Sequence, residues 1–314
     1  MKMNTTLVLS TYNGSRYLTK QLDSIRQQTL PIDEVLIVDD CSTDDTPIII
    51  SQYIARNHLD SWHFSCNEIN KGWKKNFHDL IEHASGDFIF PCDQDDVWFK
   101  DKIESMTDVM KSHPEIDVLA CSVEPIYESG AQRTKAGTED VSDGGAAILV
   151  PQGVDEKAVF IQRPGCSYCV RRSFVELIQP YWPDEYPHDV VLWTLAEVKG
   201  SLFLYNRRQM FFRRHEGNAS ARKKITRGSR IDDIVYQIDK VRLMEHFGED
   251  FGYLTKEKKI ALEDTRKWLE AREKFLESCS LKALGSLISG RAHYGTSKGM
   301  PVDLALGLFR DISL

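Results

Sequence analysis

Three carboxylates stand within four positions directly after a short apolar segment. Asp93, Asp95 and Asp96 follow residues 88–92, whose apolar character is typical of a buried strand. A strand end holds several charges cheaply only where it meets solvent, a ligand or a metal ion. Asp93 and Asp95 alternate in an extended segment and can project to one side, and Mg²⁺ and Mn²⁺ prefer carboxylate, water and phosphate oxygens. The cluster predicts a cation-binding site, with solvated turn acids as the alternative.

Three further acidic residues, in two segments, could also do chemistry. Asp39 and Asp40 end a strand-like segment, where they could cap the next helix or accept a hydrogen bond from a pyrimidine imide or a ribose hydroxyl. Asp189 opens an amphipathic segment after a turn. It could be a helix N-cap or a general base whose backbone is held rigidly.

A basic segment surrounds His215. Residues 207–230 contain nine lysines and arginines against one acid, Glu216. A solvated basic face is the plain interpretation, whereas a flexible cationic loop that folds over a diphosphate would suit an acidic site. Attraction to anionic lipid is a third use of this charge.

Alternating strand and helix patterns must position these side chains. Such alternation implies right-handed parallel crossovers and hence a doubly wound α/β sheet, in which ligands bind beyond the carboxyl ends of the strands. The polar segments 10–14, 39–43, 70–72 and 93–96 fall at those ends. We expect strands at residues 6–10, 34–38, 62–66, 87–92 and 118–122, and helices at 15–28, 47–57, 73–84 and 99–112.

The rest of the chain is less regular. Residues 124–153 read as a long loop, followed by expected strands at 159–162 and 201–205 around a helix at 188–198. Beyond residue 228 we expect helices at 231–247, 255–278 and 281–289. This helical region could pack on the rest of the chain, dock on a membrane surface or form a homodimer.

Composition excludes several classes of protein. The chain of 314 residues is 41% apolar and 28% charged, as expected for one large soluble domain or one domain with a small appendage. A net charge of −7 gives no reason to expect nucleic acid as a partner. We see no signal peptide, membrane span, dinucleotide fingerprint or P-loop, and expect a cytoplasmic protein with seven reduced cysteines. Cys166 and Cys169 lack the further ligands of a zinc site.

Taken in order, segments 10–14, 38–46, 70–72, 92–98, 188–189 and 213–218 resemble the motifs of family 2 glycosyltransferases with the GT-A fold. The Asp-Gln-Asp-Asp-Val-Trp form resembles the bacterial rhamnosyltransferase-like branch that builds surface polysaccharides. The resemblance covers residues 4–220 and implies a Rossmann-like mixed sheet flanked by helices. It also implies a catalytic domain at 1–227, with a nucleotide-sugar half at 1–122 and an acceptor and base half at 123–227, before the helical region 228–314.

The resemblance also implies roles for individual residues. Asp189 would be the catalytic base, although many members have Glu where this chain has His188. Asp39 is favoured over Asp40 as the acceptor from the base imide, and Asp93 would contact the ribose or approach the metal indirectly. Asp96 has no implied role. The implied metal ligands are Asp95 and His215, and the implied nucleotide-sugar site comprises Thr11, Tyr12, Asn13, Asp39, Asp40, Asn70, Lys71, Gly72, Asp93 and Gln94.

The implied activity is inverting, metal-dependent glycosyl transfer with Mn²⁺ or Mg²⁺. The expected donor is dTDP-rhamnose, followed by UDP-glucose or UDP-galactose, and the acceptor is a hydroxyl of a glycan, lipid-linked or glycoprotein acceptor at the inner face of the cell membrane. Two alternatives stay open: a catalytically silent sugar-binding scaffold subunit, and a haloacid-dehalogenase-like phosphatase with Asp93 as nucleophile. That phosphatase motif normally follows the first strand of its domain, whereas Asp93 follows the fourth expected strand.

Overall fold

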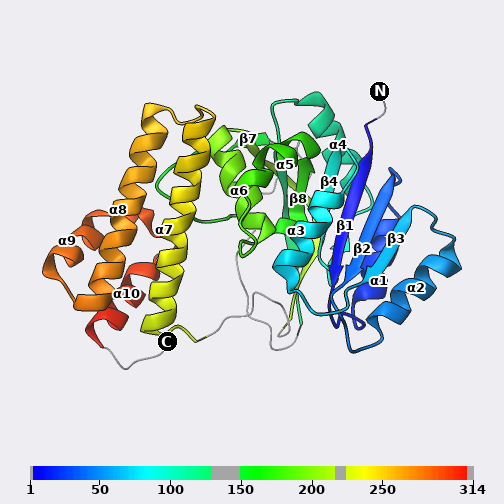
Figure 1. The fold of residues 1–314 in the computed structure, drawn as a ribbon, viewed down its shortest axis with the longest axis horizontal. Helices are drawn as coiled ribbons and strands as arrows, with labels where there is room; N and C mark the ends of the chain where they lie inside the picture. The colour runs from blue at the N-terminus through cyan, green and yellow to red at the C-terminus, as the bar shows by residue number, and fades with distance from the viewer. Residues whose placement is uncertain (1–2, 129–148, 216–223, 310–314) are drawn as a thin grey trace. The chain divides into compact units, whose positions relative to one another are not determined.

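The computed structural model describes residues 3–128, 149–215 and 224–309 (Figure 1). The chain divides into two compact units. The first unit comprises Met1–Gln152, Gln162–Ala196 and Ser201–Asn218, and the second comprises Gly153–Ile161, Glu197–Gly200 and Ala219–Leu314.

One mixed sheet forms the centre of the first unit. Its strands run in the order β3-β2-β1-β4-β8-β6-β9-β5, with β7 paired to β9. The neighbours among β1 to β4 pair in parallel, whereas β8 is antiparallel to both β4 and β6. The strands are β1 (Thr5–Thr11), β2 (Glu34–Asp39), β3 (Trp62–Cys66), β4 (Phe88–Cys92), β5 (Val97–Trp98), β6 (Val118–Tyr127), β7 (Leu149–Pro151), β8 (Tyr168–Arg171) and β9 (Leu202–Arg214).

Helices flank this sheet, and their apolar spacing explains their placement. In α1 the side chains of Leu18, Leu22 and Ile25 recur at helical spacing and are all buried. Pro47 stands in the first turn of α2, where its missing N–H costs nothing. The helices are α1 (Leu18–Arg26), α2 (Thr46–Asn57), α3 (Trp73–His83), α4 (Lys102–Ser112), α5 (Arg172–Ile178) and α6 (His188–Lys199), the last of which ends in the second unit. The expected mixed sheet flanked by helices is confirmed.

The structure corrects the expected elements in the middle of the chain. Residues 159–162 are not a strand, because the preceding backbone turns on itself through bonds from Ala158 N to Asp155 O and from Phe160 N to Lys157 O. Expected strand 201–205 extends to Arg214 as β9, so the first part of the basic segment is a strand rather than a flexible loop. The short elements β5, β7, β8 and α5 were not expected. The rest of the expected cationic loop falls partly on residues 216–223, which lie outside the described residues. Residues 129–148, in the expected long loop, lie outside them too.

The second unit is built from α7 (Arg227–Asp250), α8 (Lys256–Ser278), α9 (Leu281–Ser289) and α10 (Gly299–Leu308). Thr226, Thr255 and Ser280 cap the first three by accepting from a backbone N–H of the first turn. Asp303 on α10 is fully buried and accepts from Arg230, Arg272 and Tyr294. Among the described residues, no helix is long and apolar enough to span a bilayer.

Candidate active site

Parallel pairing brings the polar segments of the first unit to one edge of the sheet. Thr11 at the end of β1 pairs with Asp39 at the end of β2, and Leu9 pairs with Cys92 at the end of β4. The segments that follow these strands, 12–14, 40–43 and 93–96, therefore begin beside one another. This is the edge at which ligands bind in sheets of this kind.

The carboxylates of Asp39 and Asp40 organise the two neighbouring loops. Both residues are almost fully buried. Asp39 accepts from Thr11 Oγ1 at 2.9 Å and from the Oγ and N of Ser42 at 2.6 and 2.8 Å. Asp40 accepts from Asn67 Nδ2 and from the backbone N of the next loop, at residues Lys71 and Gly72, each at 2.8 Å. A carboxylate has about four acceptor positions and each of these two uses three, so Asp39 and Asp40 each keep about one position for a ligand.

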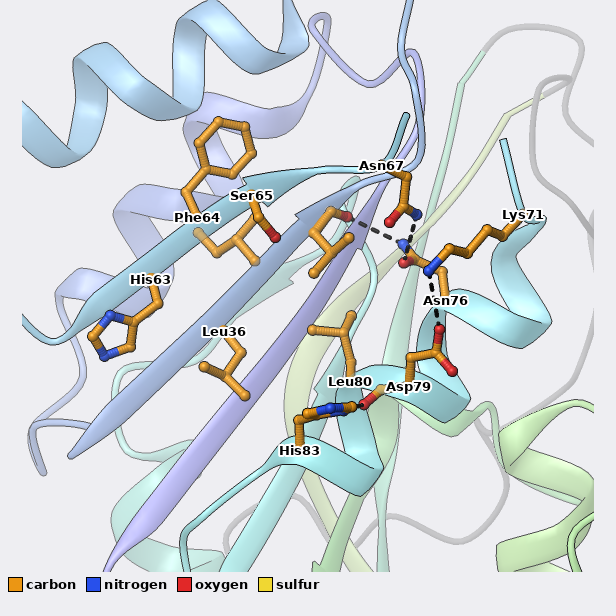
Figure 2. A pocket seen from close by; sticks show the side chains of 12 residues that line it. Leu36, His63, Phe64, Ser65, Asn67, Lys71, Asn76, Asp79, Leu80 and His83 are labelled. Atoms are coloured by element: carbon orange, nitrogen blue, oxygen red, sulfur yellow. Dashed lines mark hydrogen bonds and ion pairs between the residues drawn. The ribbon is translucent and has the colours of Figure 1, made fainter. Parts of the chain in front are cut away.

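These bonds shape the loop of residues 70–72, which we call the donor loop because it donates backbone N–H groups to Asp40. Asn70 Nδ2 donates to the carbonyl oxygen of Asp40 at 3.0 Å, and Gly72 adopts a positive φ of 82°, which favours glycine. Lys71 Nζ lies 3.3 Å from Asp79 Oδ2 on α3 (Figure 2). The loop, which we define as Asn70, Lys71 and Gly72, thus presents two backbone N–H groups to protein and an exposed lysine.

That lysine borders a groove of about 350 Å³. The groove lies over one face of β2 and β3 beside α3, with Leu36, Val38 and Leu80 among its lining and the imidazoles of His63 and His83 near its far end (Figure 2). None of the residues 93–96 lines it. The groove is therefore adjacent to the polar edge of the sheet and is not its centre.

The segment after β1 is tied to the acidic loop. Tyr12 N donates to Gln94 Oε1 and Gln94 Nε2 donates to Tyr12 O, both at 2.9 Å. A Cβ on Gly14 would lie 2.1 Å from Gln94 Oε1, so a larger residue there would break this pair. Asn13, with a positive φ of 46°, accepts from Thr43 N. These bonds leave the ring of Tyr12 47% exposed, as a stacking surface needs to be.

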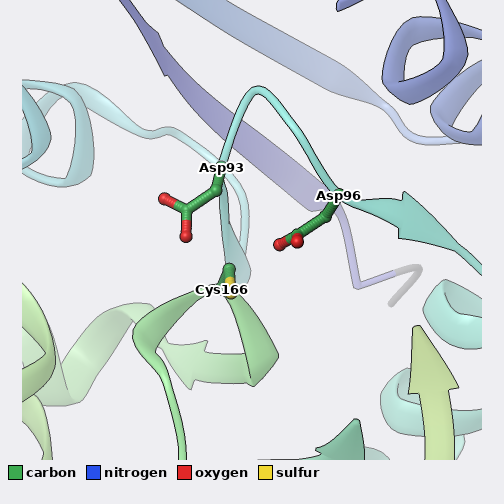
Figure 3. Close-up of side chains that lie close together, drawn as sticks. All are labelled: Asp93, Asp96 and Cys166. Atoms are coloured by element: carbon green, nitrogen blue, oxygen red, sulfur yellow. The ribbon is translucent and has the colours of Figure 1, made fainter. Parts of the chain in front are cut away.

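Two of the three acids, the half-buried Asp93 and the buried Asp96, form a cluster with a buried thiol that sequence reasoning did not connect to them. Asp93, Asp96 and Cys166 each offer a ligand atom, and these atoms lie within 4.8 Å of one another (Figure 3). Burial, followed by the charge of Asp95, raises the pKa of Asp93 to about 7. The same two causes raise the pKa of Asp96 well above its ordinary value. Acids whose pKa values are raised by burial and by neighbouring carboxylates can accommodate the charge of a divalent cation nearby.

Asp95 points to His215, the other residue that the family motifs imply as a metal ligand. Asp95 Oδ2 lies 2.7 Å from His215 Nε2, which follows the end of β9. Arg213 fixes the acidic loop from the same strand, because its N donates to Asp96 Oδ1 and its Nε to the carbonyl oxygen of Asp95. A carboxylate and an imidazole together suit Mn²⁺ with water completing the coordination, whereas Mg²⁺ would bind through the carboxylate and water oxygens.

Tyr17 and Glu128 support this pair and were not singled out from the sequence. The ring of Tyr17 lies 4.8 Å from that of His215, and its hydroxyl donates to Glu128 Oε2 at 2.7 Å. Burial and then the bond to Glu128 raise the pKa of Tyr17. Arg213 Nη1 lies 3.6 Å from Glu128 Oε1. Their wide separation in sequence left no local pattern by which to find them.

Asp189 is the second residue of α6, and one short turn separates it from the acidic cluster. Its Oδ1 accepts from Val190 N at 2.9 Å, which fixes the carboxylate at the helix start. The 3₁₀ turn η1 (Gly165–Ser167) packs against it: a Cβ on Gly165 would lie 2.9 Å from Asp189 Cβ and 2.3 Å from His188 Nε2. The next residue, Cys166, is the thiol beside Asp93. The turn thus has the candidate base on one side and the acids on the other.

His188 is a neutral packing group in this arrangement. It is 4% exposed, and its ring lies 4.2 Å from that of Phe77. Burial lowers its pKa, although the charge of Asp189 opposes this. The residue before the candidate base therefore brings no charge to the site at neutral pH.

Comparisons with known proteins agree with this geometry. Residues 6–154 match the family model of Glycosyl transferase family 2. An uncharacterized protein of Mycobacterium tuberculosis is 35% identical over 129 residues, which cover 40% of this chain but only 37% of that protein. The dTDP-rhamnosyl transferase RfbG of Shigella flexneri is 27% identical over 224 residues, 67% of this chain and 72% of RfbG.

Solved structures show the same fold. The structure of Staphylococcus aureus TarS 1–349 in complex with UDP-GlcNAc superposes with a TM-score of 0.61 at 18% identity, over 92% of this chain and 79% of that one. The mannosyltransferase PcManGT of Pyrobaculum calidifontis, in complex with GDP-Man and Mn²⁺, gives 0.54 at 17% identity, over 99% and 89%. Residues 6–154 therefore form a domain that matches glycosyl transferase family 2, and the chain has the GT-A fold of these structures.

Proposed function

We propose that this protein is an inverting, metal-dependent glycosyltransferase that moves a hexosyl or deoxyhexosyl unit from a nucleotide sugar to a hydroxyl of a bacterial surface glycan. The observation that carries the proposal is the turn η1, which packs against Asp189 and places Cys166 beside Asp93 and Asp96. A candidate base and the acids that flank the proposed metal ligand Asp95, so joined, can serve one reaction centre.

The donor side of the site would bind the nucleotide and its diphosphate. Asp39 would accept from the base imide with its remaining lone pair, and Tyr12 would stack on the base. Asp95 and His215 would hold Mn²⁺ or Mg²⁺, with Asp93 close by. Such an ion, when bound, neutralises charge on the departing nucleoside diphosphate. Lys71 would exchange its ion pair with Asp79 for one with a phosphate, because an exposed ion pair contributes little stability.

The first donor we propose is dTDP-rhamnose. Its support is the likeness to RfbG, which is described as a dTDP-rhamnosyl transferase and aligns with two thirds of this chain. UDP-sugars are the second choice, because a carboxylate that accepts from the imide reads thymine and uracil alike, and TarS was solved with UDP-GlcNAc. Thermal stabilisation by a panel of nucleotide sugars with Mn²⁺ separates these donors.

Asp189 would act on the acceptor. Its carboxylate would remove the proton of the acceptor hydroxyl, whose oxygen attacks the anomeric carbon from the face opposite the diphosphate. A single displacement inverts the anomeric configuration. The bond from Val190 N keeps Oδ1 fixed, so the carboxylate is oriented before the acceptor arrives.

The acceptor we propose is a lipid-linked glycan or glycoconjugate at the cytoplasmic face of the membrane. Support comes from α9, where Leu281 and Ile288 are exposed and Lys282 stands beside them, as in helices that lie on anionic lipid. Co-sedimentation with anionic and neutral vesicles tests this placement. Binding to neither kind of vesicle would contradict this placement and favour a homodimer surface.

The central experiment replaces Asp189 by Asn. We expect transfer to fall by about 10² to 10⁴ while donor binding, measured by calorimetry, stays within about twofold. Asp184→Asn is the matched control, because Asp184 lies in the preceding turn, is exposed and pairs with Lys75 at the surface. NMR of the wild-type product should show an inverted anomeric centre. Transfer at wild-type rate by Asp189→Asn would remove Asp189 from the role of base.

A further inference from the structure

The ammonium group of Lys102 lies fully buried beside the acidic cluster. The residue is 0% exposed and is the first residue of α4. Its Nζ donates to the carbonyl oxygen of Cys166 at 2.7 Å, contacts Met210 Sδ at 3.5 Å, and lies 3.7 Å from the centroid of the Trp98 ring. All three contacts are uncharged groups. Burying an ammonium is costly, and a helix N-terminus disfavours a cation further.

The compensating charge comes from the acids of the site. The positive charge of Lys102 acts on the carboxyl group of Asp93 and on the thiols of Cys92 and Cys166. Lys102 is therefore an internal cation whose field reaches Asp93, two positions from the proposed metal ligand Asp95. In this buried setting such a field is weakly screened.

The hydrogen bond of Lys102 also reaches the base side. Its acceptor, the carbonyl of Cys166, belongs to the turn η1, whose Gly165 packs against His188 and Asp189. The thiol of the same Cys166 lies beside Asp93. One hydrogen bond thus holds the turn that separates the acids from Asp189.

We propose that Lys102 is a positioning residue for the transfer reaction, a role that rests on the proposed function. Its ammonium fixes the turn η1 so that Asp189 keeps its distance from the metal-binding acids. Its charge also lowers the affinity of those acids for a divalent cation, which keeps the ion exchangeable with the nucleoside diphosphate that leaves.

The test replaces Lys102 by Met, which keeps the volume of the stem and removes the charge and the donor. We expect kcat to fall at least about tenfold because the base is misplaced, and Mn²⁺ to bind about tenfold more tightly because a nearby positive charge is gone. Mn²⁺ affinity is measured by calorimetry and by electron paramagnetic resonance of the free ion, without turnover. A loss of packing alone would not tighten metal binding.

Lys240→Met is the matched control. Lys240 is also a buried lysine, 4% exposed, whose Nζ donates to the carbonyl oxygen of Val159 in the second unit. We expect this variant to lose stability while kcat and Mn²⁺ affinity stay at wild-type values. Lys102→Arg is the second variant: it keeps the charge, so we expect Mn²⁺ affinity within about twofold of wild type and a reduced kcat.

The outcomes separate the two proposals. Wild-type kcat and Mn²⁺ affinity in Lys102→Met would overturn the role of Lys102, and so would losses that match those of Lys240→Met. Failure of the wild type to release nucleoside diphosphate from any donor would instead overturn the proposed function. Mn²⁺ titrations of the variants would still test the effect of the charge. Equal Mn²⁺ affinities of the wild type and Lys102→Met, or no Mn²⁺ binding by either, would contradict that effect.

Discussion

Replacing Asp40 by Asn should open the donor loop without touching the acidic cluster. Asp40 is 2% exposed, and its Oδ1 accepts from Asn67 Nδ2 and Lys71 N while Oδ2 accepts from Gly72 N. An amide oxygen can replace Oδ1, but the new NH₂ group then faces the N–H of Gly72. One hydrogen bond is lost and two become weaker because their acceptor is neutral.

The magnitude follows from these three bonds. A hydrogen bond to a charged group contributes about 1.5 to 3 kcal/mol, and Gly72 N keeps a second acceptor in Asn70 Oδ1 at 3.0 Å. We therefore expect Asp40→Asn to lower the free energy of unfolding by about 2 to 4 kcal/mol. Because the loop loses its bond at Gly72 and keeps only a weaker one at Lys71, nucleoside diphosphate should also bind more weakly, by about tenfold or more.

Urea titration followed by tryptophan fluorescence measures the first quantity, and calorimetry with UDP and dTDP measures the second. Asp45→Asn is the control, since Asp45 is exposed at the start of α2 and its side chain makes no capping bond. We expect this control within about 0.5 kcal/mol of wild type. A similarly small change in Asp40→Asn would refute the conclusion that its carboxylate organises the loop.

Two further predictions concern titration and stability. The pKa of Asp93, raised from 3.8 to about 7, means that the folded protein keeps a proton that the unfolded chain releases. Without metal, stability should therefore fall as pH rises from 4 through 7, while Mn²⁺ affinity should rise over this range and level off above it; titrations at several pH values check this, and a pH-independent affinity would contradict it. Asp303→Asn should lower the free energy of unfolding by about 3 to 5 kcal/mol, because Arg230 and Arg272 lose a fully buried partner. The exposed pair of Asp239 with Arg242 supplies the control, and Asp239→Asn should cost less than about 1 kcal/mol in the same urea titration.

The arrangement of the first four strands was predictable from sequence because its signals are local. Strands β1 to β4 are short apolar runs that alternate with periodic helices, so their parallel pairing and the meeting of segments 10–14, 39–43 and 93–96 follow from general rules. The pairing of Asp95 with His215 was expected only through the order of family motifs. No periodicity connects two residues 120 positions apart.

The rest depends on contacts that a linear pattern does not encode. The strand β8 is four residues long and lies antiparallel between β4 and β6, so nothing in its own composition marks it as central. Cys166 enters the acidic cluster only through the turn before β8. Residues 159–162 have the composition of a strand but no sheet partner, and their neighbours turn instead.

The pairing of β5 with β9 has a consequence for the order in which the protein can be made. Val97 and Trp98 pair with Phe211 and Met210, which are translated more than one hundred residues later. The acidic loop between β4 and β5 is therefore anchored at one end long before its other end has a partner. At roughly 5 to 20 residues per second, the nascent chain waits on the order of ten seconds for that partner to emerge from the ribosome. During this interval the loop is held by β4 and by the Tyr12–Gln94 pair but not by β9, and we expect the proposed cation site to mature last in the first unit.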